Sequence, residues 1–161
     1  MRLFIVRHGH YTGDGSHDPP ISALGMVQAS DAGKAITLYS AHIYTIFSSP
    51  LRRAVMTAEV ISGITGAPLS VVDALEPEAD PWRFMDMVRM NTDHDIVLVG
   101  HLPNLRKICS VLCSPEEPGT LSIESGGMAC LRSPPEVGMA NFEVEHIFTS
   151  DQVRELALRS A

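Results

Sequence analysis

The sequence predicts a single-domain α/β fold in which a mostly parallel sheet lies between two layers of helices. Short apolar runs such as Leu3–Val6 and Ile96–Val99 have the length and composition of strands that are buried on both faces. Segments with apolar residues at helical spacing alternate with these runs, which is the pattern of βαβ units. The chain has 161 residues, enough for one hydrophobic core, so residues 1–161 are predicted to form one domain.

Each predicted strand is a short, mostly apolar run. The strands are expected at Leu3–Val6, Thr45–Ser48, Leu69–Val72, Ile96–Val99, Met128–Leu131 and Glu143–Phe148. Beyond late strands and turns, residues 121–141 support no prediction.

The predicted helices have start or stop signals. Ser22 has the side chain of an N-cap for the first helix, and Pro50 suits the first turn of the second, where its missing N–H costs little. Gly63 or Gly66 is expected to end the second helix. The later helices are expected over Trp82–Met90, from Pro103 to Leu112, and, after the capping-box pattern Thr149-x-x-Gln152, through Leu158.

Composition and charge exclude several classes of protein. The net charge of −7 argues against nonspecific nucleic-acid binding, which needs a basic face. No apolar run reaches the roughly 18 residues of a membrane span, and the run Leu3–Val6 is too short for a signal peptide, so a cytoplasmic protein is expected. The three cysteines give no disulfide framework. Cys109 and Cys113 share a helix face and are interpreted as core residues rather than as a metal or redox pair.

Polar side chains that could bind a ligand or take part in a reaction follow three of the predicted strands. The first strand ends in Arg7-His8-Gly9-His10, the second leads through Ser48-Ser49-Pro50 to Arg52-Arg53, and a later one ends in Gly100-His101. Because parallel strands bring their carboxyl ends to one edge of a sheet, these residues are expected in one cleft. The planar fork of the arginine guanidinium group matches phosphate oxygens, and a helix that begins near Pro50 or Pro103 would add N–H groups. A phosphate-like ligand is therefore predicted.

Histidine in such a pocket can do more than bind. Neutral imidazole is a competent nucleophile near pH 7, and a second, protonated histidine would stabilise the charge on the phosphoryl oxygens. Two arginines and one imidazolium supply enough positive charge that neither a metal nor another cofactor is required.

Three motifs in this order resemble the histidine phosphatase superfamily, also called the phosphoglycerate mutase-like family. They are Arg7-His8-Gly9, then Ser48-Ser49-Pro50-Leu51-Arg52-Arg53-Ala54 with Thr57-Ala58, then Gly100-His101, and Ile21-Ser22-x-x-Gly25 resembles the family's segment before the first helix. The resemblance implies one phosphoglycerate mutase-like histidine phosphatase domain. It also implies that His8 is the phosphorylated nucleophile, that Arg7 and Arg53 bind phosphate, and that His101 is the second pocket histidine. Arg52 lies one position off the pattern and receives no role.

The expected general acid departs from the family pattern. Many members have a glutamate two residues after a leucine in this loop, where the present chain has Pro77 after Leu75-Glu76. Glu76 is the nominated acid, with Glu78 and Asp80 as substitutes. An alkyl phosphate needs a general acid worth about 10²–10⁴ in rate, whereas phosphohistidine expels an imidazole, which is a better leaving group. A site with a poor acid therefore suits phosphohistidine.

The short connection between the motifs favours the same substrate. About 25 residues separate Glu76 from His101, which leaves no room for a long lid insertion, so the pocket could accept a phosphorylated side chain of a protein. The chain thus resembles the SixA-type phosphohistidine phosphatases, and no membrane or nucleic-acid partner is expected. The alternatives are a phosphomonoesterase for sugar or alkyl phosphates, a metallohydrolase built on His8, His10 and His101, and a noncatalytic phosphate-binding module.

Several further residues have ordinary explanations. His10 is interpreted as a loop residue, Trp82 as a packing residue and Asn104 as part of a solvated helix face. For Ser48, contact with phosphate and a hydrogen bond to the backbone are equally compatible with its position.

Overall fold

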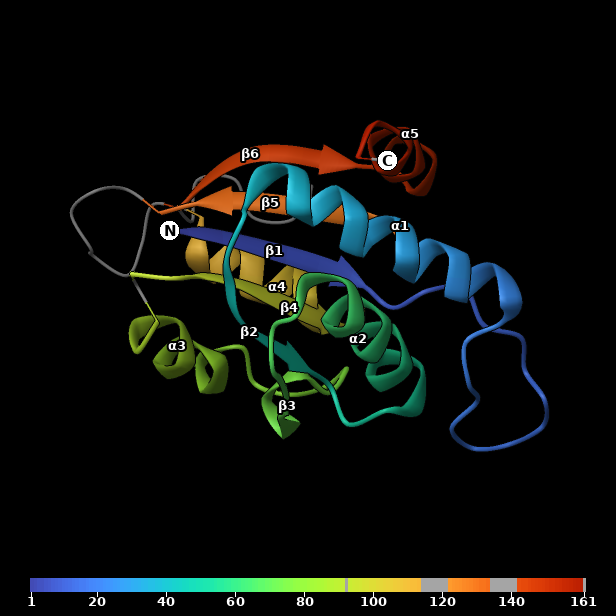
Figure 1. Cartoon of the computed structure of the whole chain (residues 1–161). Coiled ribbons are helices and arrows are strands. Elements are labelled where there is room, and N and C mark those ends of the chain that lie inside the picture. The colour runs from blue at the N-terminus through green and yellow to red at the C-terminus, as the bar shows by residue number, and fades with distance from the viewer. Residues whose placement is uncertain (92, 114–121, 134–141, 161) are drawn as a thin grey trace.

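The computed structural model describes residues 1–91, 93–113, 122–133 and 142–160. In these residues a six-stranded sheet has the order β3-β2-β4-β1-β5-β6 (Figure 1). The strands are β1 (Arg2–Arg7), β2 (Ile43–Ser48), β3 (Leu69–Val71), β4 (Asp95–Gly100), β5 (Met128–Arg132) and β6 (Glu143–Phe148). Strands β1, β2, β3 and β4 pair in parallel, β5 is antiparallel to β1, and β6 is antiparallel to β5. The predicted, mostly parallel sheet is confirmed.

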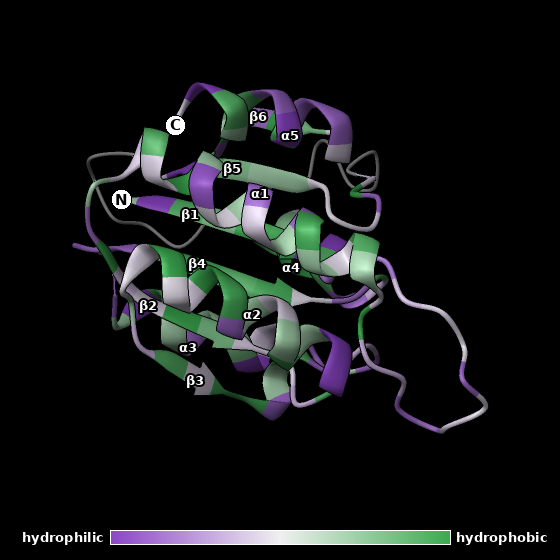
Figure 2. Cartoon of the chain, turned by 45° about the vertical axis from the view of Figure 1, so that its right-hand side comes forward, coloured by the Kyte–Doolittle hydropathy of each residue, from purple (hydrophilic) through white to green (hydrophobic). Residues whose placement is uncertain are grey.

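Helices cover both faces of the sheet. They are α1 (Ala23–Tyr39), α2 (Arg52–Thr65), the short η1 (Asp73–Leu75), α3 (Trp82–Arg89), α4 (Asn104–Leu112) and α5 (Ser150–Arg159). One buried cluster joins Phe4 and Val6 of β1 to α1, α2 and α5, and the other joins Leu3 and Ile5 to α3 and α4. Alternate residues of β1 therefore face opposite layers, as the apolar run predicted. Figure 2 shows these central strands as largely hydrophobic beneath the helices.

Local signals explain three of the helix ends. The Ser22 side chain accepts a hydrogen bond from the backbone N–H of Gly25, Thr149 and Gln152 form the capping box, and Gly66 ends α2 in the left-handed conformation. The start of α2 differs from the prediction, because the helix begins at Arg52 rather than at Pro50.

The connection between β3 and β4 carries only η1 and α3 in its described residues, so the predicted absence of a long lid is confirmed. On α4, Cys109 is buried in the core and Cys113 packs against it, in keeping with their interpretation as core residues. Of the segment 121–141, which supported no prediction, residue 121 and residues 134–141 lie outside the described residues. Over the described ranges, the structure contains no helix that is both long and apolar enough to cross a membrane.

Candidate active site

The register of the central strands brings the three motifs together. Arg7 at the end of β1 is paired with Gly100 at the end of β4, and the neighbouring β2 pairs Ser48 with Val99 of β4. The backbone N–H of His8 donates to the Gly100 carbonyl at 3.1 Å, which continues the ladder past the strand ends. The residues after β1, β2 and β4 therefore meet at the carboxyl edge of the sheet, where ligands bind in open α/β folds.

Two glycines allow the first motif to lie against helix α1. A Cβ atom on Gly9 would lie 2.6 Å from the carbonyl oxygen of Gly25, and one on Gly25 would lie 2.2 Å from that of His10. Neither position can therefore hold a side chain while the backbones are this close. The Gly9 N–H also donates to the Thr57 hydroxyl, which in turn donates to the Arg53 carbonyl. These contacts hold the end of β1 against α1 and α2.

His8 lies in the pocket with one ring nitrogen available as a nucleophile. Its side chain is buried, and Nδ1 is 2.9 Å from the Gly9 carbonyl oxygen. Because a carbonyl oxygen can only accept a hydrogen bond, Nδ1 carries the proton and Nε2 keeps its lone pair. The Arg53 Nε–H points to that same Nε2 at 3.4 Å. The nitrogen that would attack phosphorus thus faces a guanidinium group.

His101 packs beside His8, and Ser49 holds its ring. The ring centroids of the two histidines are 4.9 Å apart, and His101 Nε2 is 2.9 Å from the Ser49 hydroxyl oxygen. Sequence reasoning gave Ser49 no role, although its place between a strand end and Pro50 was visible. Ser48, by contrast, turns its hydroxyl to the Ser49 carbonyl, so its hydrogen bond to the backbone is confirmed.

Three contacts set the plane of the Arg53 guanidinium group. One is the bond to His8 just described, a second is Asp18 Oδ1 at 3.6 Å, and the third is the Tyr11 ring, whose centroid lies 5.0 Å from the guanidinium carbon. The Asp18 carboxylate also accepts the backbone N–H of Arg52 and so caps helix α2. This N–H group at the start of α2 is therefore satisfied by Asp18.

Arg7 is held by the segment that precedes β5. Its backbone N–H donates to the Gly127 carbonyl, one guanidinium nitrogen donates to the Ile123 carbonyl at 3.2 Å, and Gly126 donates to the His8 carbonyl. The described part of the segment that supported no prediction thus supports the first motif.

Two buried nitrogen atoms of the pocket lack a hydrogen-bond partner. Over the described residues, the buried side-chain atoms without a partner are Arg7 Nε, His101 Nδ1 and Asn104 Oδ1. A buried polar group without a partner costs about 1–3 kcal/mol, so such groups mark places where a ligand can supply the bond. Arg7 Nε is a donor in all conditions, and protonated His101 would become one, as an oxyanion requires.

Both pocket histidines are neutral when no anion is bound. The pKa of His8 is lowered to about 4, mainly by burial; the hydrogen bond to the Gly9 carbonyl opposes this, and the Arg53 and Arg7 charges add to it. Burial also lowers the pKa of His101 to about 3, followed by the effects of His8, Arg53 and Arg7. A phosphate dianion would oppose these cationic charges and raise both pKa values. Proton uptake by His101 is therefore expected to accompany phosphate binding.

The pH dependence of stability follows from these shifts. In the unfolded chain both histidines bind a proton below their ordinary pKa of 6.5, while the folded pocket resists protonation down to about 4 for His8. We expect the free energy of unfolding to fall as pH is lowered from 7 to 5, by up to about 2 kcal/mol per histidine. Urea unfolding at several pH values checks this. The variant His8→Gln should show a shallower dependence, and an equal slope in both proteins would contradict the prediction.

Glu76 is not brought into contact with the four pocket residues. Its side chain is exposed, and its carboxylate makes no hydrogen bond or ion pair with Arg7, His8, Arg53 or His101, all of which the structure describes. What the structure fixes is the Glu76 backbone, whose carbonyl accepts a hydrogen bond of 2.7 Å from the Asn104 side chain.

Asn104 corrects one sequence interpretation. Its side chain is completely buried rather than on a solvated helix face, and it donates to the carbonyls of both Ala74 and Glu76. Asn104 thus ties α4, which follows His101, to the loop of the nominated acid. An asparagine inside an otherwise amphipathic helix gave no signal of this, because its partners are backbone atoms far away in sequence.

The His10 ring is engaged with the start of α1, because its Nδ1 is 2.8 Å from the Ser22 hydroxyl oxygen.

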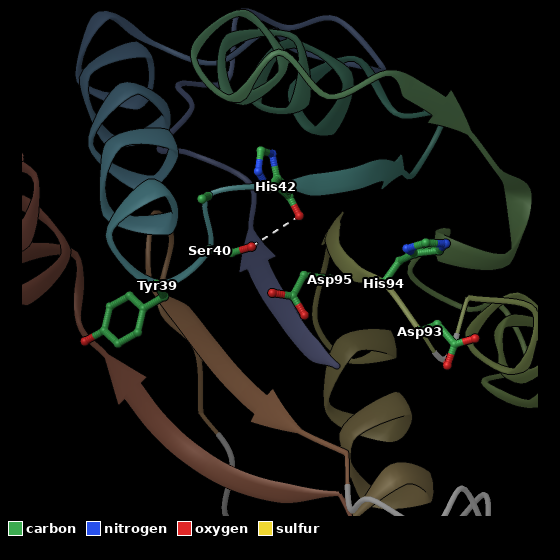
Figure 3. A pocket seen from close by; sticks show the side chains of 7 residues that line it. Tyr39, Ser40, His42, Asp93, His94 and Asp95 are labelled. Atoms are coloured by element: carbon green, nitrogen blue, oxygen red, sulfur yellow. Dashed lines mark hydrogen bonds between the residues drawn. The ribbon is translucent and has the colours of Figure 1, made fainter.

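Within the described ranges, no group of three or more His, Cys, Asp or Glu residues is placed to hold a metal ion. A hollow of about 390 Å³, lined by residues such as Tyr39, His42 and Asp95, lies at the opposite, amino edge of the parallel strands (Figure 3).

The fold and the grouped histidines and arginines are those of a histidine phosphatase. A sequence model of the histidine phosphatase superfamily (branch 1) matches residues 3–86, more than half of the chain. The chain belongs to this superfamily. It is also 27% identical over 143 residues to an uncharacterized protein of Picosynechococcus sp. strain PCC 7002, an alignment that covers 83% of this chain and 86% of that protein.

Solved structures show the same architecture. The protein histidine phosphatase SixA in complex with tungstate has a TM-score of 0.81 at 20% identity, covering 94% of this chain and 98% of SixA. Phosphoserine phosphatase from Entamoeba histolytica in complex with 3-phosphoglyceric acid has a TM-score of 0.72 at 15% identity, covering 94% of this chain and 98% of that one. These likenesses confirm the predicted fold.

Proposed function

We propose that this protein is a phosphatase that works through a covalent phosphohistidine on His8 and removes phosphate from phosphohistidine in a protein. One observation carries the proposal: the unprotonated Nε2 of buried His8 faces the guanidinium group of Arg53, in a pocket completed by Arg7 and His101. A nucleophile beside fixed cationic donors is what transfer of a phosphoryl group requires.

The reaction would proceed in two displacements. His8 Nε2 attacks phosphorus, and the bond to the substrate imidazole breaks with its electron pair passing to the departing nitrogen. The step balances when the substrate ring is in its imidazolium form, with a proton on the other nitrogen, because the ring then leaves as neutral imidazole. Water then attacks phosphorylated His8, the electron pair returns to Nε2, and the proton from water goes to phosphate. Arg7, Arg53 and protonated His101 would hold the phosphoryl oxygens in both steps.

The exposed position of Glu76 favours phosphohistidine over alkyl phosphates as the substrate. No proton has to be delivered to a neutral imidazole that leaves, whereas an alkoxide needs a positioned acid. In its described residues the β3–β4 connection carries only η1 and α3 and no long inserted lid, which favours access by a protein side chain. The partner would then be a phosphorylated protein domain, met in the cytoplasm. SixA, a protein histidine phosphatase with the same fold, supports this choice.

The second candidate is a phosphatase of small phosphate esters. The Entamoeba histolytica phosphoserine phosphatase has the same fold, so the architecture is compatible with such substrates. In that case one acid of the loop, with Glu76 first, would have to reach the leaving oxygen.

The substrate is tested by measuring phosphate release from a phosphohistidine-bearing protein domain and from phosphoserine, for the wild type and for Glu76→Gln. We expect faster release from phosphohistidine and a change of less than about threefold in that rate on substitution. The neighbouring exposed Glu78→Gln is the matched control. Faster release from phosphoserine, together with a loss of about 10²-fold or more in Glu76→Gln alone, would favour the small-ester phosphatase instead.

A further inference from the structure

Tyr11 is the exposed aromatic ring in contact with the reacting centre. It follows the first motif, and its ring centroid lies 5.4 Å from that of His8 in an edge-to-face arrangement. The Arg53 guanidinium carbon lies 5.0 Å from the same ring centroid. Tyr11 is 40% exposed, unlike His8 and His101, which are 3% and 2% exposed. It thus links the buried phosphate pocket to solvent.

The backbone keeps Tyr11 at this position. Tyr11 forms an isolated antiparallel bridge with Ile21, and Ile21 is buried directly before the N-cap of α1. The neighbouring His10 backbone accepts the N–H of Ser22 at 2.8 Å. The loop between Tyr11 and Ile21 extends away from the body of the molecule (Figure 1), but the bridge between these two residues joins its ends. The ring of Tyr11 is therefore carried by a braced segment.

Tyr11 is an exposed ring that borders both groups proposed to act on the phosphoryl group, the His8 ring and the Arg53 guanidinium. In an in-line displacement by His8 Nε2, the leaving group lies beyond phosphorus and departs toward solvent. We infer that Tyr11 is a specificity-determining residue whose ring contacts the leaving group and favours a flat aromatic or heteroaromatic one, such as imidazole. This inference rests on the proposed function and names the property of the substrate that the site selects.

The physical basis is the contact between aromatic rings. Offset or edge-to-face pairs add to simple burial an effect of roughly two- to tenfold in affinity, which a saturated ring of similar size does not obtain. Tyr11 also holds the Arg53 fork by a cation–π contact, and its loss should weaken the binding of every phosphate-like ligand to a similar extent. The ratio of the dissociation constants of two ligands therefore separates the two roles. Contact of Tyr11 with the leaving group changes this ratio, whereas the cation–π contact with Arg53 leaves it unchanged.

The test compares two ligands with a stable carbon–phosphorus bond, phenylphosphonate and cyclohexylphosphonate, with inorganic phosphate as the reference. Dissociation constants are measured by calorimetry for the wild type, Tyr11→Phe, Tyr11→Leu and the control Tyr44→Leu. Tyr44 is exposed and stacks on His94, away from the pocket. We expect the wild type, Tyr11→Phe and Tyr44→Leu to prefer the phenyl ligand by roughly two- to tenfold, and Tyr11→Leu to bind both ligands equally.

The outcomes are distinguishable. A wild type that binds phosphate but shows no preference, or a Tyr11→Leu variant that keeps the preference, would overturn the inference and leave the proposed function standing. A preference lost in Tyr11→Phe as well would also overturn it, because the hydroxyl rather than the ring would then be responsible. A wild type that binds none of the three ligands would overturn the proposed function together with the inference.

Discussion

Replacing His8 by alanine is expected to abolish the formation of a phosphoenzyme and to lower turnover by at least about 10⁴-fold. The substitution removes the His8 Nε2 atom, whose lone pair is free because the protonated Nδ1 is bound to the Gly9 carbonyl. The measurement is the transfer of radiolabelled phosphate from a phosphohistidine-bearing domain to the protein, stopped within one turnover.

Two features make this experiment decisive. Phosphohistidine is stable to alkali and labile to acid, so the labelled species can be told from a phosphoserine. The variant His10→Ala is the matched control, because His10 lies two residues away and its ring is hydrogen-bonded to the Ser22 hydroxyl. Equal labelling of wild type and His8→Ala, or labelling that disappears only in His10→Ala, would show that the covalent mechanism proposed for His8 is wrong.

Replacing Arg53 by glutamine is expected to lower kcat/KM by about 10²–10³-fold, whereas the same change at Arg52 should alter it by less than about threefold. The guanidinium group of Arg53 reaches His8 Nε2 and is only partly exposed, while the Arg52 side chain is exposed and its backbone serves to start α2. Two adjacent arginines on one helix therefore provide a matched pair with the same charge and side-chain length but different contacts.

A second substitution separates charge from geometry at Arg53. The variant Arg53→Lys keeps the positive charge but loses the planar fork, so it should recover only part of the activity. Thermal unfolding of all three variants should give similar midpoints, which excludes misfolding as the cause. If Arg52→Gln were the damaging change, or if both changes had equal effects, the assignment of the phosphate-binding arginine would be wrong.

The fold could be predicted from the sequence because each local signal agreed with the tertiary arrangement. The runs at Leu3–Val6 and Ile96–Val99 are buried on both faces, as an uninterrupted apolar run predicts for a central strand of a sheet covered by helices on both sides. The caps at Ser22 and Thr149 are likewise local, since each hydrogen bond joins residues three positions apart. The start of α2 escaped prediction because Asp18, which caps it, comes from a loop far away in sequence.

The site could be predicted in part for the same reason. His8 and His101 follow strands that pair with each other, so the topology alone brings them to adjacent positions. The residues that orient them left no pattern in the sequence. Ser49 lies 52 positions from His101, and Ile123 lies 116 positions from Arg7, so these contacts exist only after the sheet has formed.

By itself, the sequence determined the class of fold, the family motifs and the candidate phosphate pocket, because these depend on apolar periodicity and on residue types at strand ends. Only the tertiary structure decided which nitrogen of His8 is free, that Arg53 faces it, that Asn104 is buried against the Glu76 loop, and that Tyr11 lies beside the pocket. The physical reason is that hydrogen bonding, burial and ring contact are properties of neighbours in space, and most of these neighbours are distant along the chain.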